Sequence, residues 1–166
     1  MKLLAMFAAL AAPLQAQRPC LTASEAEALA AVALPDILRQ TGVTCAARLP
    51  ATSLLRRPQS PLLGRYEAEA ERAWPAARAA LGKLVDPAAQ ALLGSDFARP
   101  VLTTMVTPLI VGRIAVKDCG TIDRLVTLLE PLPPRNTAGV VVATVRHLQK
   151  QPANAKGPVG ALPLCP

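Results

Sequence analysis

The chain has 166 residues and a formal net charge of +7 at pH 7, with 52% hydrophobic but only 2% aromatic residues. This length suits one ordinary domain that buries roughly two-thirds of its unfolded surface, so no second domain is required. With so few aromatic side chains, recognition of single-stranded nucleic acid by base stacking is excluded, and we expect no nucleic-acid partner. A core poor in rings must be filled by aliphatic side chains, which favours alanine-rich helices packed close together.

The first 16 residues have the layout of a secretory signal peptide. One cation, Lys2, precedes an apolar run from Leu3 to Ala12, and small residues follow around Ala16. The run is too short to cross a bilayer. We therefore predict a signal peptide over 1–16, a mature chain without a transmembrane segment, and export to the periplasm or the medium. The richness in proline, alanine and arginine points to a bacterial source.

Four cysteines follow this leader, and they are Cys20, Cys45, Cys119 and Cys165. An even number of cysteines in an exported chain predicts two disulfides. A zinc site is disfavoured, because there is no C-x-x-C pair and His147 is the only histidine. Neither of the glycine-rich loops that bind phosphate occurs. We expect no metal and no cofactor.

The first helix should run from about 23 to 41. Thr22 and Glu25 form a capping box at its start, and Gly42 is a stop signal at its end. Pro35 falls inside this range and should bend the helix or split it in two. Whether the helix is bent or split decides the disulfide pairing. The ends of a continuous helix of this length lie roughly 30 Å apart, too far for one disulfide.

Further helices follow from local signals. A short helical piece is predicted within 46–56, and Ser60 with Pro61 should start a long helix. The predicted apolar stripe of that helix comprises Leu63, Tyr66, Ala70, Trp74, Ala77, Leu81 and Leu84. A charged ladder on its other face comprises Arg65, Glu69 and Arg72.

The central part of the chain is less regular. Asp86 and Pro87 should open a short helix that Gly94 closes. The segment 98–116 is ambiguous, because its β-branched residues suit a strand. Helical spacing of Leu102, Met105, Val106 and Leu109 favours a helix.

The last two helices are predicted over 122–132 and 137–150, joined by a proline-rich connector and packed as an antiparallel hairpin. In such a hairpin the end of the second helix returns toward Cys119. We expect the helical domain to span 17–151. The remaining segment, 152–166, is a tail rich in proline and glycine that needs Cys165 to pin it.

The hairpin favours a disulfide between Cys119 and Cys165, which leaves Cys20 to pair with Cys45 if Pro35 splits the first helix. If the first helix is straight, the pairing becomes Cys45 with Cys119 and Cys20 with Cys165. Sequence alone leaves both open.

The sequence offers one weak catalytic pair, Cys119 and His147, in which the imidazole would lower the pKa of the thiol and accept its proton. Two observations disfavour the pair. His147 suits the C-terminal end of a helix as a cation, and a free Cys119 would leave another cysteine unpaired. No serine nucleophile elbow occurs.

Taken together, the sequence predicts an all-α domain of about six helices, several of them bent at Pro35, Pro75 and Pro108. Its expected function is a non-catalytic binding or interaction module of the cell envelope or periplasm. The partner, a peptide, lipid or envelope component, would occupy an apolar groove between the bent helices.

Two alternatives stay open. The first is a thiol-dependent hydrolase using Cys119 and His147. The second is a cationic binder of anionic envelope surfaces, because the chain from Pro131 onward has no acidic residue. The cations of that segment are Arg135, Arg146, Lys150 and Lys156.

Overall fold

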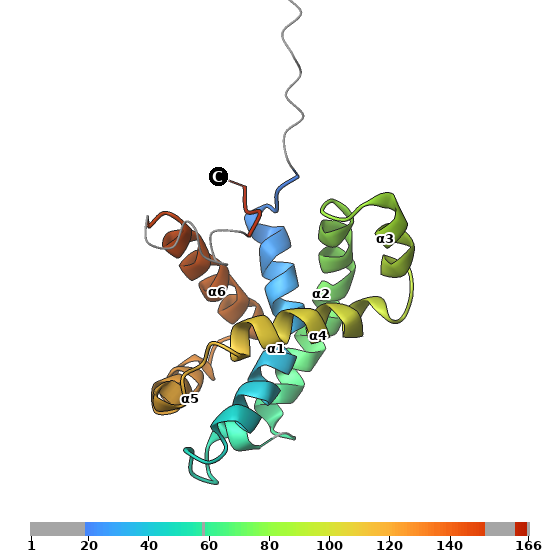
Figure 1. The fold of residues 1–166 in the computed structure, drawn as a ribbon. Helices are drawn as coiled ribbons and strands as arrows, with labels where there is room; N and C mark the ends of the chain where they lie inside the picture. The colour runs from blue at the N-terminus through green and yellow to red at the C-terminus, as the bar shows by residue number, and fades with distance from the viewer. Residues whose placement is uncertain (1–18, 58, 152–161, 166) are drawn as a thin grey trace, which may run out of the picture.

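The computed structural model describes residues 19–57, 59–151 and 162–165. Over these residues the chain is helical, with no strand beyond a single bridge between Leu21 and Leu164 (Figure 1). The elements are α1 (Ala23–Cys45), η1 (Leu54–Arg56), α2 (Pro61–Gly82), α3 (Pro87–Leu93), α4 (Ala98–Val111), η2 (Val116–Asp118), α5 (Cys119–Leu129) and α6 (Pro134–Gln149). The predicted all-α class is confirmed. The predicted signal peptide lies outside the described residues.

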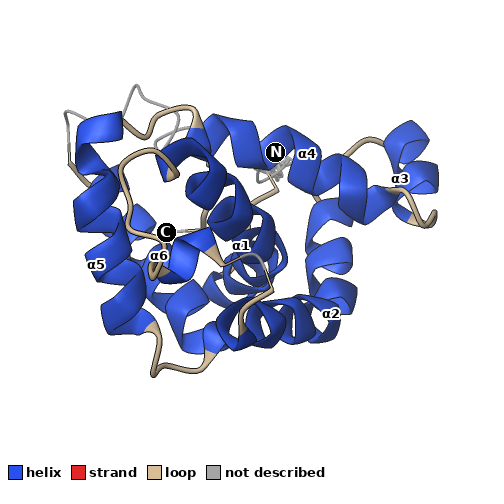
Figure 2. Ribbon diagram, turned by 90° about the horizontal axis from the view of Figure 1, so that it is seen from below, coloured by secondary structure: helices blue, strands red, loops and turns tan. Residues whose placement is uncertain are grey.

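Helix α1 is the central element, and α2, α4 and α6 all pack against it (Figures 1 and 2). Its start is the predicted capping box. The backbone N–H of Thr22 donates to Glu25 Oε2 at 2.9 Å, and Thr22 Oγ1 accepts from the backbone N–H of Glu25 at 3.4 Å. Both bonds satisfy donors that the first helical turn leaves free.

Pro35 does not split α1, which runs without a break to Cys45. The possibility of two separate helices was therefore wrong. Proline inside a helix removes one hydrogen bond and costs about 3 kcal/mol. Pro35 and the four residues before it are all buried, so the packing of this part of α1 offsets that cost.

Helix α2 begins at Ser60 and Pro61 as predicted, and Ser60 Oγ accepts from the backbone N–H of Leu63 at 3.3 Å. Most of the predicted stripe is buried, and Tyr66 donates from its hydroxyl to Thr137 Oγ1 of α6 at 3.0 Å. Trp74, predicted to lie in the core, is only partly buried. In the predicted charged ladder, Arg72 pairs with Glu69, whereas Arg65 pairs with Glu130 across the α2–α5 junction.

The segment 46–56 contains the predicted short helical piece at its C-terminal end. The piece is the 3-10 helix η1, which follows a turn and ends at Arg56. Pro50 limits its length, because it lacks the N–H that an α-helix through the whole segment would need. Ser53 then caps η1 by accepting from the backbone N–H of Leu55 at 3.2 Å.

The ambiguous segment 98–116 is helical, as favoured. Helix α4 covers it from Ala98 to Val111, and η2 begins at Val116. Among the described residues no single helix is long and apolar enough to cross a membrane. Only the bent pair Ala98–Val111 and Val116–Leu129, at 89° to each other, meets that test of length and composition together.

Helices α5 and α6 are joined by a short connector as predicted, but α6 packs mainly on α1 rather than along α5. It also begins at Pro134, three residues before the predicted start at 137. The end of α6 therefore does not return to Cys119, and the argument that paired Cys119 with Cys165 fails.

The disulfides are Cys20–Cys165 and Cys45–Cys119, with Cα–Cα distances of 5.0 and 5.6 Å. The preferred pairing of Cys119 with Cys165 and Cys20 with Cys45 was wrong. The structure has the pairing expected for a straight first helix, since Cys20 and Cys45 lie at opposite ends of α1.

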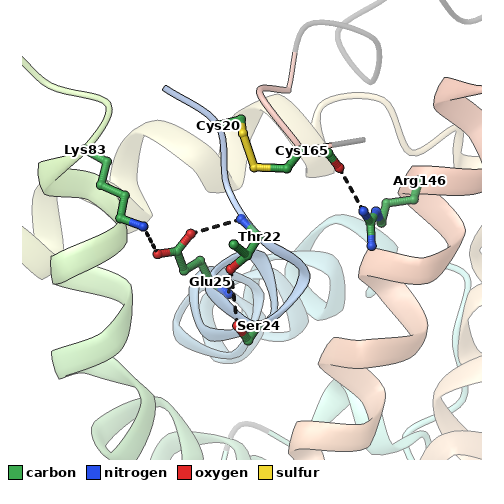
Figure 3. Close-up of a disulfide and its surroundings, with 7 residues drawn as sticks. All are labelled: Cys20, Thr22, Ser24, Glu25, Lys83, Arg146 and Cys165. Carbon is green, nitrogen blue, oxygen red and sulfur yellow. Dashed lines mark hydrogen bonds and ion pairs between the residues drawn. A yellow bond between two sulfur atoms is a disulfide. The ribbon is translucent and has the colours of Figure 1, made fainter. Parts of the chain in front are cut away.

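The two ends of the described chain are held together beside the first disulfide (Figure 3). The backbone N–H of Leu21 donates to Pro163 O at 2.7 Å, and the backbone N–H of Cys165 donates to Leu21 O at 2.8 Å. Arg146 of α6 donates to Cys165 O at 2.8 Å. Residues 152–161 of the predicted tail lie outside the described residues.

Glu25 gives the fold a specific dependence on pH. The Lys83 ammonium group donates to its carboxylate, as does the backbone N–H of Thr22, and these bonds lower the pKa of Glu25 from 4.5 to about 2 (Figure 3). Since the folded pKa lies below the unfolded one, ionised Glu25 stabilises the fold above pH 4.5. That contribution is lost as the pH falls toward 2.

We expect Glu25→Gln to lower the urea midpoint at neutral pH and to reduce the fall of that midpoint on acidification, because glutamine has no proton to gain. Urea unfolding across this pH range measures the effect. Glu27→Gln is the control, since Glu27 lies in the same helix without an ion pair to any described residue. An unchanged pH dependence in Glu25→Gln would contradict the account.

Candidate functional site

A cavity of about 250 Å³ lies where the C-terminal half of α1 meets η1 and the start of α2, at the lower end of α1 in Figure 1. We call it the α1–η1–α2 groove. Its lining residues are Leu38, Arg39, Gly42, Val43, Ala46, Leu54, Leu55, Arg56, Arg57, Ser60, Leu62 and Leu63. The groove thus combines an aliphatic lining with three arginines and contains no carboxylate.

The apolar part of the groove comes from all three elements. Leu55 of η1 and both Leu62 and Leu63 of α2 are buried, so they form a fixed floor. Val43 of α1 is 68% exposed, which leaves a large apolar side chain in water beside the groove. An aliphatic floor with an exposed valine beside it suits an apolar group of a ligand better than a sugar or a nucleotide.

Gly42 allows η1 to lie close to α1. A Cβ atom at this position would be 2.0 Å from the carbonyl oxygen of Leu55, so only glycine fits there without a shift of the backbone. Arg56 closes the loop on the other side by donating to Leu49 O at 3.0 Å. These two contacts fix the distance between the walls of the groove.

The second disulfide fastens this region to α5. Cys45 is the last residue of α1 and Cys119 is the first of α5, and both are fully buried against Leu49 and Leu55. Beside them, Ser53 Oγ donates to Asp123 Oδ1 at 2.5 Å. The loop that carries the groove is therefore held by a covalent bond and a polar contact to the same helix.

The charges of the three lining arginines are not equally available. Arg39 pairs with both Asp36 and Glu67, which neutralise it. Arg56 donates to a neutral carbonyl, and Arg57 makes no ion pair with any described residue. The edge of the groove therefore carries uncompensated positive charge, which favours an anionic group on a ligand.

A second hollow of about 560 Å³ lies between α1, α2, α4 and the segment that joins α3 to α4. Its lining includes charges of both signs from Asp36, Glu71, Arg78, Asp96 and Arg99, together with Trp74. Arg99 and Glu71 pair with each other. This hollow lacks an aliphatic floor, and its opposed charges do not select one class of ligand, so the α1–η1–α2 groove is the stronger candidate site.

The predicted catalytic pair is not assembled. Cys119 Sγ is bonded to Cys45 Sγ, and all four cysteines of the chain are in disulfides, so the thiol that a hydrolase needs is not free. His147 is exposed near the end of α6, with Nε2 3.3 Å from Nε2 of Gln151. Among the described residues no three histidine, cysteine or acidic side chains gather in a way that would hold a metal ion.

The cations of the acid-free C-terminal segment are also dispersed. Arg146 is engaged with Cys165 O, whereas Arg135 and Lys150 are exposed. Lys156 lies outside the described residues. This segment shows no assembled anion site within the part of the chain that the structure describes.

Sequence reasoning interpreted the stretch around Arg56 and Arg57 only as a break between helices. The signal that could have found the groove is compositional. Residues 46–60 carry three arginines and no acid, with leucines on both sides. Cations without nearby acids in a short loop between two helices indicate a place where an anion can bind.

Comparisons with family models, with curated proteins and with solved structures find no match to this chain. Over the described residues the chain is a small all-α domain closed by two disulfides, and its candidate site is the α1–η1–α2 groove.

We expect Gly42→Ala to destabilise the protein by about 1–3 kcal/mol, because the added methyl would force η1 away from α1. Gly64→Ala is the matched control. A Cβ at Gly64 meets nothing within 4 Å, so the change should stabilise the helix by about 0.5–1 kcal/mol. Urea unfolding of both variants measures the difference, and equal stabilities would contradict the close contact at Gly42.

Proposed function

We propose that this protein is a non-catalytic binding module of the cell envelope or periplasm, and that its ligand is a small amphipathic anion held in the α1–η1–α2 groove. The observation that carries the proposal is the combination of a buried leucine floor with uncompensated arginine at the edge. An apolar chain would lie on the leucines, and its carboxylate, phosphate or sulfate would meet Arg56 and Arg57.

The size of the groove limits the ligand. A volume of about 250 Å³ lies just below the usual range of ligand pockets, which begins at about 300 Å³. One apolar chain or one side chain of a peptide fits this volume, whereas a large cofactor does not. The ligand class is therefore a single-chain amphiphile or the acidic end of an apolar peptide, and the same chemistry recognises both.

The envelope location is supported by two independent features. Two disulfides suit an oxidising compartment outside the cytoplasm. The predicted leader over 1–16 directs the chain to the same compartment. Binding without catalysis is supported by the disulfide at Cys119, which removes the one thiol nucleophile that the sequence suggested.

The test compares two probes with the same apolar chain and opposite head charges, dodecanoate and dodecyltrimethylammonium. Isothermal titration calorimetry below the micelle concentration of each probe should show dodecanoate binding more tightly, because the groove edge is cationic. Arg57→Gln should weaken dodecanoate binding about tenfold, or about 1.4 kcal/mol. Arg48→Gln is the matched control, since Arg48 is exposed in the same loop but does not line the groove.

Val43→Glu should also weaken dodecanoate binding, because it places a carboxylate beside the groove where the anion must enter. Val140→Glu, at an exposed valine of α6, should leave binding unchanged. Equal affinity for the two probes, or an Arg57→Gln variant that binds as the wild type does, would overturn the proposal.

A further inference from the structure

Helix α4 buries two threonines and leaves a row of large apolar side chains exposed. Its buried residues are Ala98, Thr103, Thr107 and Val111, so two threonines point inward against the rest of the fold. Its outer side carries a ridge of Phe97, Val101, Met105 and Leu109. Phe97, Met105 and Leu109 are each more than 60% exposed. Large apolar side chains of a surface helix normally face the core, so an exposed ridge beside two buried threonines departs from the usual pattern.

Burying the two threonines costs free energy that hydrogen bonds offset only in part. Thr103 Oγ1 donates to Pro100 O at 3.2 Å, but Thr107 Oγ1 is buried without a hydrogen-bond partner among the described residues. A buried hydroxyl that loses its hydrogen bonds to water is destabilising. The helix nevertheless leaves three large apolar side chains more than 60% exposed. An exposed apolar row of this kind indicates that the ridge is covered when the protein works.

The ridge is accessible to a partner. Figure 1 shows α4 lying across the front of α1, and Figure 2, turned by 90°, shows no other described helix on its outer side. The four side chains recur at every fourth position, so they form one row of the kind that packs against a matching row on another helix. The ridge itself contains no charged residue.

The charges beyond the two ends of the ridge indicate which partner it fits. Asp96 precedes the ridge and Arg113 follows it, and neither makes an ion pair with any described residue. A parallel copy of the helix would bring like charges together, whereas an antiparallel copy brings the Arg113 end to the Asp96 end. In an antiparallel pair centred on Met105, Val101 faces Leu109 and Phe97 faces Arg113, whose guanidinium can stack on the ring.

We propose that α4 is the interface of a symmetric homodimer, with the second copy of α4 running antiparallel across a twofold axis at Met105. The ridge is self-complementary in size and end charge, as an interface of this symmetry requires. The proposal uses none of the residues of the α1–η1–α2 groove and does not rest on the proposed function. One pair of helices of this length covers an area near the lower end of specific interfaces, so the dimer should be weak.

A cysteine cross-linking experiment tests the geometry. Residue 105 lies on the proposed axis at any crossing angle of the two helices, so Met105→Cys should form a covalent dimer under mild oxidation. Phe97→Cys should not, because the two copies of residue 97 lie at opposite ends of the interface. Leu128→Cys is the matched control for an exposed apolar position outside the ridge, and it should give only the background yield.

A second experiment does not depend on added cysteines. Sedimentation velocity over a range of protein concentrations should show the wild type passing from monomer to dimer. Met105→Glu should shift this transition to at least tenfold higher concentration, because it places two carboxylates together on the axis. Leu128→Glu should sediment as the wild type does. The circular dichroism spectrum of each variant verifies that the helices still form.

Either of two results would overturn the proposal. The first is equal cross-linking at positions 97, 105 and 128. The second is a wild-type protein that is monomeric at every concentration. If that monomer sediments with vesicles containing an anionic lipid and Met105→Glu abolishes this binding, the ridge faces a membrane surface instead of a second copy.

Discussion

The continuity of α1 through Pro35 is the constraint on which the rest of the structure depends. A helix of 23 residues keeps its ends roughly 34 Å apart, so Cys20 and Cys45 must each find a partner elsewhere in the chain. Cys20 pairs with Cys165 and joins the two ends of the described chain, whereas Cys45 pairs with Cys119 and draws α5 against η1. In the chain-entropy picture, bridges that close loops of this length contribute about 4–5 kcal/mol each.

The groove follows from the second of these bridges. The bridge and the contact of Ser53 with Asp123 hold the 46–60 loop against α5. Gly42 then lets η1 approach α1 closely enough for Leu54 and Leu55 to line a cavity. The arginines of the loop are left at the edge because the floor is apolar and cannot take them. The same fold leaves a second apolar surface on α4. Two threonines of this helix are buried, and its large apolar side chains are exposed. We propose a small ligand for the groove and a second copy of the chain for the α4 ridge.

The helices could be predicted because their signals are local. The capping residues Thr22, Ser60 and Asp86 act within one turn of the chain, and each caps the helix that it predicts. The disulfide pairing could not be predicted, because it depends on whether burial outweighs the cost of Pro35, and burial is a property of the whole fold. The orientation of α4 could not be predicted from the sequence either. Its threonines and its apolar residues both recur with helical spacing, and only the contact with α1 decides which set points inward. The groove residues come from three elements, so no single stretch of sequence reveals them.

The most direct test of this account is peptide mapping by mass spectrometry of the folded protein, alkylated and digested without reduction. The account predicts two linked peptide pairs, one joining Cys20 to Cys165 and the other joining Cys45 to Cys119, with no alkylated cysteine. A peptide that links Cys20 to Cys45 would contradict it, because the two residues could meet only if α1 were broken at Pro35.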